Sequence, residues 1–151
     1  MRYWLMKSEP SDVSIDDLSS LPEKTIAWYG VRNYQARNFM RDQMRVGDSV
    51  FFYHSSCSEP GIAGIAEVCK LAYPDTTQFD PTNKYFDPKA TSQNPRWFNV
   101  EVKFIKKTRL VGIKELRSYS DISSLRILQT GNRLSITPVD PSEWKFIMGI
   151  L

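Results

Sequence analysis

The chain has 151 residues, a formal net charge of +3 at pH 7 and 13% aromatic residues. This length predicts a single domain over residues 1–151, with a core large enough to need neither disulfides nor a metal. A hydrophobic fraction of 41% and a charged fraction of 25% are ordinary for soluble domains, which excludes disordered and membrane-spanning classes.

The N-terminal part predicts short strands and helices. Residues 3–6 are apolar and aromatic and predict a strand that starts almost at the first residue, and residues 24–28 predict another. Between them, Ser14 predicts the capped start of a short helix that Pro22 ends. A longer helix is expected over residues 33–45, where apolar residues recur with helical spacing.

The rest of the chain predicts a mixture of strands and helices around one long loop. Further strands are expected over residues 49–54, 62–70, 97–106 and 133–137, and helices over residues 112–119 and from Pro141 onward. A proline-punctuated segment over residues 73–95 matches no regular element. Loops this long inside a compact domain are typical of binding lids or of partly disordered segments.

Residues 97–106 show the clearest alternation in the chain. Phe98, Val100, Val102 and Phe104 share one face, and the residues between them are mostly polar. A strand with one buried face belongs to an antiparallel or mixed sheet. Because strands and helices do not alternate regularly, we expect an α+β fold, a small, partly closed β-barrel with short peripheral helices.

The predicted helix over residues 33–45 carries an apolar stripe and a basic stripe side by side. The stripes consist of Ala36, Met40 and Met44, and of Arg37, Arg41 and Arg45. A solvated face is the ordinary interpretation of such a basic stripe. The functional alternative is that its arginines bind phosphates.

Common catalytic and metal-binding motifs are absent from the sequence. It contains no G-x-S-x-G elbow, Walker loop or G-x-G-x-x-G turn, and the sole histidine, His54, lacks the cysteine pair of a zinc deaminase. Cys57 and Cys69 form neither a paired zinc pattern nor a disulfide framework, which predicts reduced thiols. We therefore expect no catalytic residue, no metal and no cofactor. His54 is either a hydrogen-bonded structural residue or a pocket ligand.

Charge and the N-terminal sequence limit where the protein works. The first apolar run breaks at Lys7, so neither a signal peptide nor a membrane span is expected, and the protein is expected in the cytoplasm or the nucleus. The chain has 20 Lys and Arg residues against 17 Asp and Glu residues. This mild basic excess permits a nucleic-acid partner without demonstrating one.

The stretch AWYGVRNYQARN, residues 27–38, combines aromatic rings with planar hydrogen-bonding groups. A nucleobase is bound by stacking on rings and by polar contacts to its edge. Trp28 and Tyr34 supply rings, Gly30 allows close backbone approach, and Asn33 lies where a helix begins. This combination predicts a base-binding pocket. The alternative is that the rings belong to the core and Asn33 only caps the helix.

Two further rings are candidates for the same pocket. Strict alternation places Trp97 on the polar face of its strand, where a core tryptophan is not expected. It either forms a pocket wall or is covered by the proline-rich loop next to it. Tyr53 lies opposite Phe52 and His54 in phase and is a weaker candidate of the same kind.

Several long motifs closely resemble the EVE domain family, in the same order along the chain. They are YWLMKSEP from Tyr3, WYGVRNYQARNFMR from Trp28, GDSVFFYHSSCSEPGIAGIAEV from Gly47, AYPDTTQFDP from Ala72 and RLSITPV from Arg133. The resemblance implies a PUA-like fold, related to YTH and ASCH domains. It also implies a nucleic-acid-binding module that recognises a modified base in DNA or RNA, such as 5-methylcytosine, in an aromatic pocket.

The resemblance, together with the residue patterns above, gives a set of expected site residues. The expected ligand-binding residues are Lys7, Ser8, Trp28, Gly30, Val31, Arg32, Asn33, Tyr53, His54 and Trp97. Arg37 and Arg41, with Arg32, are expected to hold the flanking phosphates.

Two other functions stay open at this point. The first is an enzyme acting on modified bases or nucleosides, because the ASCH branch includes hydrolytic members, with Glu9 or Glu67 as a general base. The second is a module that binds a small ligand or a protein, which the modest net charge allows.

Overall fold

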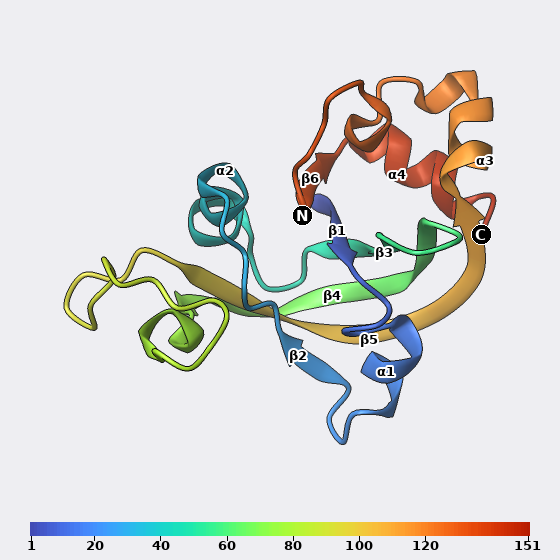
Figure 1. Ribbon diagram of the computed structural model, residues 1–151. Helices are drawn as coiled ribbons and strands as arrows, with labels where there is room; N and C mark the ends of the chain where they lie inside the picture. Colours follow the sequence, from blue (N-terminus) through green and yellow to red (C-terminus); the bar gives the residue numbers. More distant parts are fainter.

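A computed structural model describes residues 1–151 and shows one six-stranded sheet in the order β2-β5-β4-β3-β1-β6 (Figure 1). The strands are β1 (Tyr3–Ser8), β2 (Thr25–Ala27), β3 (Ser49–His54), β4 (Gly61–Pro74), β5 (Phe98–Gly112) and β6 (Ile136–Val139). The pair β1 and β3 is parallel and the other pairs are antiparallel, so the sheet is mixed. It is not closed, because β2 and β6 are edge strands. The predicted α+β class is confirmed.

Short helical segments surround the sheet. They are α1 (Ile15–Ser20), α2 (Tyr34–Asn38), a π-helical turn η1 (Phe39–Gln43), α3 (Ile113–Ser118) and α4 (Pro141–Met148), with the 3-10 turns η2 (Thr76–Phe79), η3 (Ser120–Ile122) and η4 (Arg126–Leu128). Both α1 and α4 begin in capping boxes, at Ser14 with Asp17 and at Asp140 with Glu143. The predicted starts of these two helices are therefore confirmed. No helix is long and apolar enough to span a bilayer.

The sheet separates two hydrophobic cores because side chains alternate between its faces. Trp4, Met6 and Phe52 point into one core, which also receives residues from α1, α2 and η1. Leu5 and Phe51 point into the other, which is closed by residues of α3, η3, η4 and α4. Figure 1 shows α3 and α4 gathered on one side of the sheet, close to β6.

Irregular pairing bends the long central strands. The register between β4 and β5 shifts at several points along their length, and that between β3 and β4 shifts at Phe52 and Tyr53. Such bulges increase local twist and curve a strand. As a result β5 curves along its length, from the loop before it to α3 at its other end (Figure 1).

Several element boundaries differ from those predicted. The expected helix over residues 33–45 ends at residue 43, because its last part is a π turn in which Met44 N donates to Phe39 O. The last strand covers Ile136–Val139 rather than residues 133–137. Pro138 is tolerated in it because β6 pairs on one side only. This shift leaves residues 133–135 outside the sheet, where they border the site described next.

Candidate functional site

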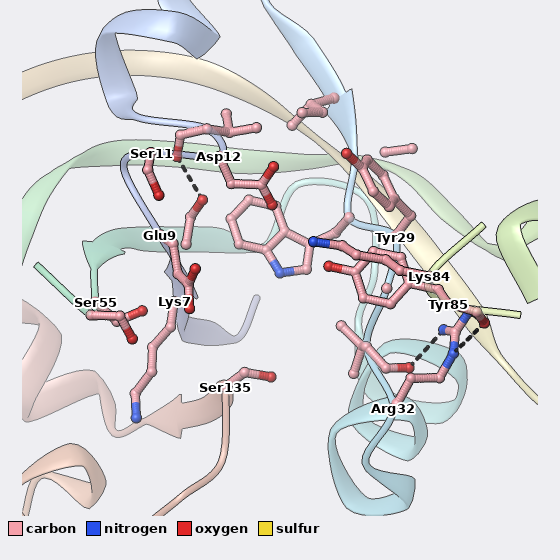
Figure 2. Close-up of a pocket in the computed structure, with 18 of the residues that line it drawn as sticks. Lys7, Glu9, Ser11, Asp12, Tyr29, Arg32, Ser55, Lys84, Tyr85 and Ser135 are labelled. Carbon is pink, nitrogen blue, oxygen red and sulfur yellow. Dashed lines mark hydrogen bonds between the residues drawn. The ribbon is translucent and has the colours of Figure 1, made fainter. Parts of the chain in front are cut away.

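A pocket of about 670 Å³ opens beside the ends of β1 and β3. Its 19 lining residues come from the end of β1 and the segment after it, from β2 and the segment that follows, from the β3–β4 turn, from the loop before β5 and from the segment before β6 (Figure 2). This volume lies in the range usual for small-ligand sites. Segments distant in sequence thus converge on one concave site.

Aromatic rings form one side of the pocket. Trp28 is 8% exposed and meets the ring of Phe52 edge to face, with centroids 5.6 Å apart. Tyr29 and Tyr85 also meet edge to face, with centroids 6.0 Å apart. Figure 2 shows Tyr29 and Tyr85 side by side on this side of the pocket. Three rings therefore line a site open enough for a planar ligand.

Gly30 allows Tyr85 to lie against the segment after β2. Its φ is +82°, a left-handed conformation that favours glycine, and a Cβ here would lie 2.6 Å from the Tyr85 ring. Any larger side chain at this position would displace the ring. The Gly30 N–H donates to Asp75 Oδ2 over 2.8 Å, which fixes the turn.

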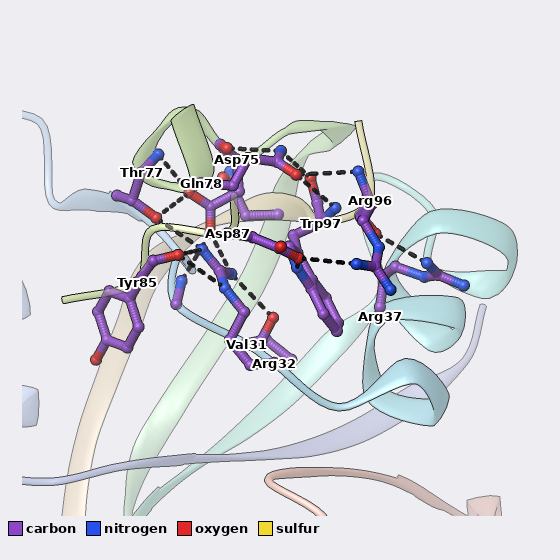
Figure 3. Close-up of polar contacts among 12 residues, drawn as sticks. Val31, Arg32, Arg37, Asp75, Thr77, Gln78, Tyr85, Asp87, Arg96 and Trp97 are labelled. Carbon is purple, nitrogen blue, oxygen red and sulfur yellow. Dashed lines mark hydrogen bonds and ion pairs between the residues drawn. The ribbon is translucent and has the colours of Figure 1, made fainter. Parts of the chain in front are cut away.

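Arg32 and Asp75 attach the loop before β5 to the pocket (Figure 3). The Arg32 guanidinium donates to Asp75 Oδ2, to Thr77 Oγ1, to the Val31 carbonyl and, through two N–H groups, to the Tyr85 carbonyl. A guanidinium has five N–H groups, so each of them has a protein acceptor. Arg32 therefore lines the pocket but holds the loop and has no free donor for a ligand.

Asp75 is the buried anion of this network. Its side chain is fully buried and accepts from Gly30, Arg32 and the backbone and hydroxyl of Thr77. Burial by itself raises the pKa of Asp75, but hydrogen bonds from Thr77, Gly30 and Arg32 outweigh it and hold the pKa below its ordinary value. The carboxylate is therefore charged at neutral pH. It connects the segment after β2, through Gly30 and Arg32, to the loop before β5, through Thr77.

The opposite side of the pocket is polar and basic. Lys7 N donates to Ser135 O over 2.8 Å and Ser55 N donates to Ser8 O over 3.0 Å, so the backbone ties three segments together here. Figure 2 shows Lys7, Ser55 and Ser135 on this side. Partial burial lowers the pKa of Lys7.

Two carboxylates complete the lining. Glu9 and Asp12 are exposed and lie in the segment between β1 and α1. The pKa of Lys84, across the pocket, is raised chiefly by Tyr85 and further by the charges of Asp12 and Glu9. The pocket thus carries both cationic and anionic side chains.

The structure brings six of the ten expected ligand-binding residues to the pocket. They are Lys7, Ser8, Trp28, Gly30, Val31 and Arg32. Within this group, the Ser8 hydroxyl donates a hydrogen bond to Val13 O over 2.6 Å. This bond stabilises the segment between β1 and α1, so the hydroxyl proton is not available to a ligand. The remaining four, Asn33, Tyr53, His54 and Trp97, do not line the pocket.

His54 and Asn33 support helices. His54 Nε2 accepts from the backbone N–H of Ile15, the first residue of α1, and the ring meets Phe52 edge to face. Burial lowers the pKa of His54, which favours the neutral form that this bond requires. Asn33 caps α2, since its Oδ1 accepts from Ala36 N. The structural interpretation applies to both residues.

Trp97 and Tyr53 are buried elsewhere. Trp97 is 6% exposed, donates through Nε1 to Asp87 and stacks on Tyr34 with centroids 4.8 Å apart. The proline-rich loop covers it, which is the alternative that the sequence left open. Tyr53 is 4% exposed in the core closed by α3 and α4, because alternation along β3 places its ring on the same face as Phe51.

Arg37 and Arg41, which were expected to hold phosphates together with Arg32, lie on α2 and η1, outside the pocket. Arg37 donates to the Arg96 carbonyl (Figure 3). It also donates to Asn38 Oδ1. Arg41 pairs with its neighbour Asp42, with an Nε–Oδ1 distance of 2.8 Å. Their donors serve protein acceptors, and the structure does not bring them to the pocket with Lys7 and Trp28.

Sequence reasoning missed several lining residues. Lys84 and Tyr85 lie in the long loop over residues 73–95, and the lid character expected of such a loop was the signal that pointed to them. Arg133 lines the pocket because β6 starts later than predicted. Of the two candidate general bases, Glu9 lines the pocket and Glu67 lies on β4 opposite Ser49, outside it.

Nothing in the pocket forms a metal centre. No group of three or more His, Cys, Asp or Glu side chains is placed to hold a metal ion. Cys57 and Cys69 are free cysteines.

Known proteins resemble the whole chain. Residues 2–150 match the EVE domain. Human thymocyte nuclear protein 1 is 44% identical over 165 residues, which cover 98% of this chain and 73% of that protein. A crystal structure of a Pseudomonas syringae protein superposes with a TM-score of 0.93 at 47% identity and covers 98% of each chain. Human THYN1 in complex with DNA containing 5-methylcytosine superposes with a TM-score of 0.91 at 42% identity, covering 99% of this chain and 97% of that one.

Proposed function

The chain belongs to the EVE domain family and has its PUA-like fold, and on that premise we propose that it binds nucleic acid that carries a modified base, with 5-methylcytosine in DNA as the first candidate. The base enters the pocket lined by Trp28, Tyr29 and Tyr85. The similarity to human THYN1 in complex with DNA containing 5-methylcytosine carries this proposal, because it extends over 99% of the chain.

The pocket chemistry supports the same function. Stacking of a base on an aromatic side chain contributes about 1 to 3 kcal/mol, and the three rings offer such faces. Hydroxyls, carboxylates and the Lys7 amine around them match the donors and acceptors of a base edge. A base inside a duplex presents neither face, so it has to leave the stack to enter.

Fluorescence anisotropy with labelled oligonucleotides tests the proposal directly. The probes are matched single strands and duplexes with one central cytosine, 5-methylcytosine, 5-hydroxymethylcytosine or N6-methyladenine, together with an RNA of the same sequence. We expect tighter binding to one modified probe than to its unmodified match. Equal affinity for all probes would overturn the recognition of a modified base.

A pocket variant links that preference to the site. Trp28 is part of a core, so its removal would cost about 3 to 5 kcal/mol of folding free energy and would obscure the result. Tyr29 is 41% exposed and is the cleaner choice. We expect Tyr29→Ala to weaken binding of the preferred probe about tenfold through lost stacking, with a near-native melting temperature.

We also propose that the protein works in a reducing compartment, in contact with the nucleic acid of the cell. The free cysteines Cys57 and Cys69 fit a reducing environment, and relatives bear the name thymocyte nuclear protein 1. Fractionation of cells that produce the tagged protein, with staining for DNA, measures whether it is found with the nucleic acid.

A further inference from the structure

The cations that line the pocket differ in whether protein atoms already occupy their donors. Arg32 donates all of its N–H groups to protein acceptors. Lys7 and Arg133 line the same pocket, and their side chains make no hydrogen bond and no ion pair. Cationic side chains without protein acceptors keep their donors for an anion from outside the protein.

Lys7 and Arg133 are held on one side by the backbone. The bond from Lys7 N to Ser135 O places the end of β1 beside the segment that carries Arg133. The bond from Ser55 N to Ser8 O adds the β3–β4 turn. This side of the pocket is therefore built from three fixed segments, and not from the tips of mobile side chains alone.

Three serine hydroxyls line the same pocket as the two cations. Ser55, Ser56 and Ser135 line the pocket, and none of their hydroxyls donates a hydrogen bond to the protein. Ammonium, guanidinium and hydroxyl groups together form the donor set that proteins use for phosphate oxygens.

We propose that Lys7, Arg133 and the hydroxyls of Ser55, Ser56 and Ser135 form a phosphate-binding edge for the nucleotide whose base occupies the pocket. The proposal rests on the proposed function, because it supplies the phosphate partner of the same base site. It assigns phosphate binding to these residues instead of to the arginines of α2 and η1.

The position of this edge across the pocket from the rings orients the nucleotide (Figure 2). A nucleotide that binds with its phosphate at Lys7 and Arg133 therefore directs its base toward the rings of Tyr29 and Tyr85. Glu9 and Asp12 also line the pocket, and their charges favour the ammonium form of Lys84. A neutral ligand gains less from this edge than an anion does.

A methylphosphonate scan separates phosphate binding from base recognition. A single-stranded DNA probe with one 5-methylcytosine is prepared with a neutral methylphosphonate at one linkage at a time around that base. Binding of each probe is measured for the wild type, Lys7→Gln and Arg133→Gln. We expect one substitution near the modified base to weaken wild-type binding about tenfold, and much less in each variant.

Two further variants control for charge and fold. Lys145→Gln removes the same charge from the exposed surface of α4, where the side chain has no partner, and is expected to keep the full methylphosphonate effect. Lys7→Arg keeps a cation and is expected to retain most of it. Arg133 is exposed, so its variant carries the test even where Lys7→Gln unfolds.

Each outcome decides one proposal or both. Equal methylphosphonate effects in the wild type and the two pocket variants would overturn the phosphate-binding edge while leaving base recognition intact. A phosphate effect that depends on Lys7 and Arg133 but is the same for cytosine and 5-methylcytosine would overturn only the modified-base proposal. No binding of any probe would overturn both.

Discussion

The pocket edge at Lys7 and the loop anchor at Arg32 are both basic, but their surroundings are opposite. Lys7 and Arg133 have no acceptor within the protein, whereas Arg32 donates to Asp75, Thr77 and two backbone carbonyls. A positive charge beside a pocket is available to a ligand only where the fold has left its donors free. Residue type alone does not distinguish the two groups, and hydrogen-bond geometry does.

The largest effect on stability is expected from removing Asp75, the buried carboxylate that bonds to Arg32 and Gly30. Asp75→Ala removes a fully buried carboxylate and leaves the Arg32 guanidinium and the Gly30 N–H without it. We expect a loss of about 3 to 4 kcal/mol in the free energy of unfolding, because a partly buried charge is left unpaired. Urea denaturation at neutral pH measures this loss. A decrease below about 1 kcal/mol would show that the network contributes little.

The same carboxylate gives this network a defined pH dependence. The pKa of Asp75 is depressed below its ordinary value of 3.8, so the stabilisation is complete above pH 3.8 and is lost as pH falls through the lower folded-state pKa. The difference in stability between wild type and Asp75→Asn is therefore expected to stay constant from neutral pH down to this value and to shrink below it. A difference that already shrinks near pH 6 would contradict this assignment.

A smaller effect is expected where the anchor meets the aromatic side of the pocket. Gly30→Ala strains a left-handed residue and pushes a Cβ into the Tyr85 ring, so we expect a loss of about 2 kcal/mol and weaker binding of the preferred probe. Gly131→Ala is the matched control, because Gly131 has a φ of +79° and open space around it. Thermal unfolding and anisotropy measure both variants. Equal losses would show that backbone strain alone accounts for the effect.

The smallest effect is expected on η1. Arg41 is exposed and pairs with Asp42, outside the pocket, so Arg41→Gln is expected to change stability by less than about 0.5 kcal/mol. The salt dependence of nucleic-acid binding is expected to stay the same as in the wild type. A shallower salt dependence in this variant would return Arg41 to the phosphate contacts, as its spacing along the helix suggested.

Much of the fold followed from local sequence. Ser14 and Pro141 marked helix starts because capping and the fixed φ of proline act within one turn. Alternation over residues 97–106 identified a strand with one mainly buried face, and the structure has β5 there. The π turn of η1 was missed, because an apolar repeat of four residues favours an ordinary helix.

The sequence determined which kinds of group the site contains. Rings next to a positive-φ glycine in AWYGVRN, and a lysine and a serine at the end of the first strand, are local features, and they line the pocket. The tertiary structure decided which of the candidates meet. Trp97 and His54 bond to Asp87 and Ile15 outside the pocket lining, whereas Tyr85 and Arg133 reach the lining from distant segments of the chain. Whether a donor is free or already bonded depends on atoms far away in the chain, so it cannot be predicted from the local sequence.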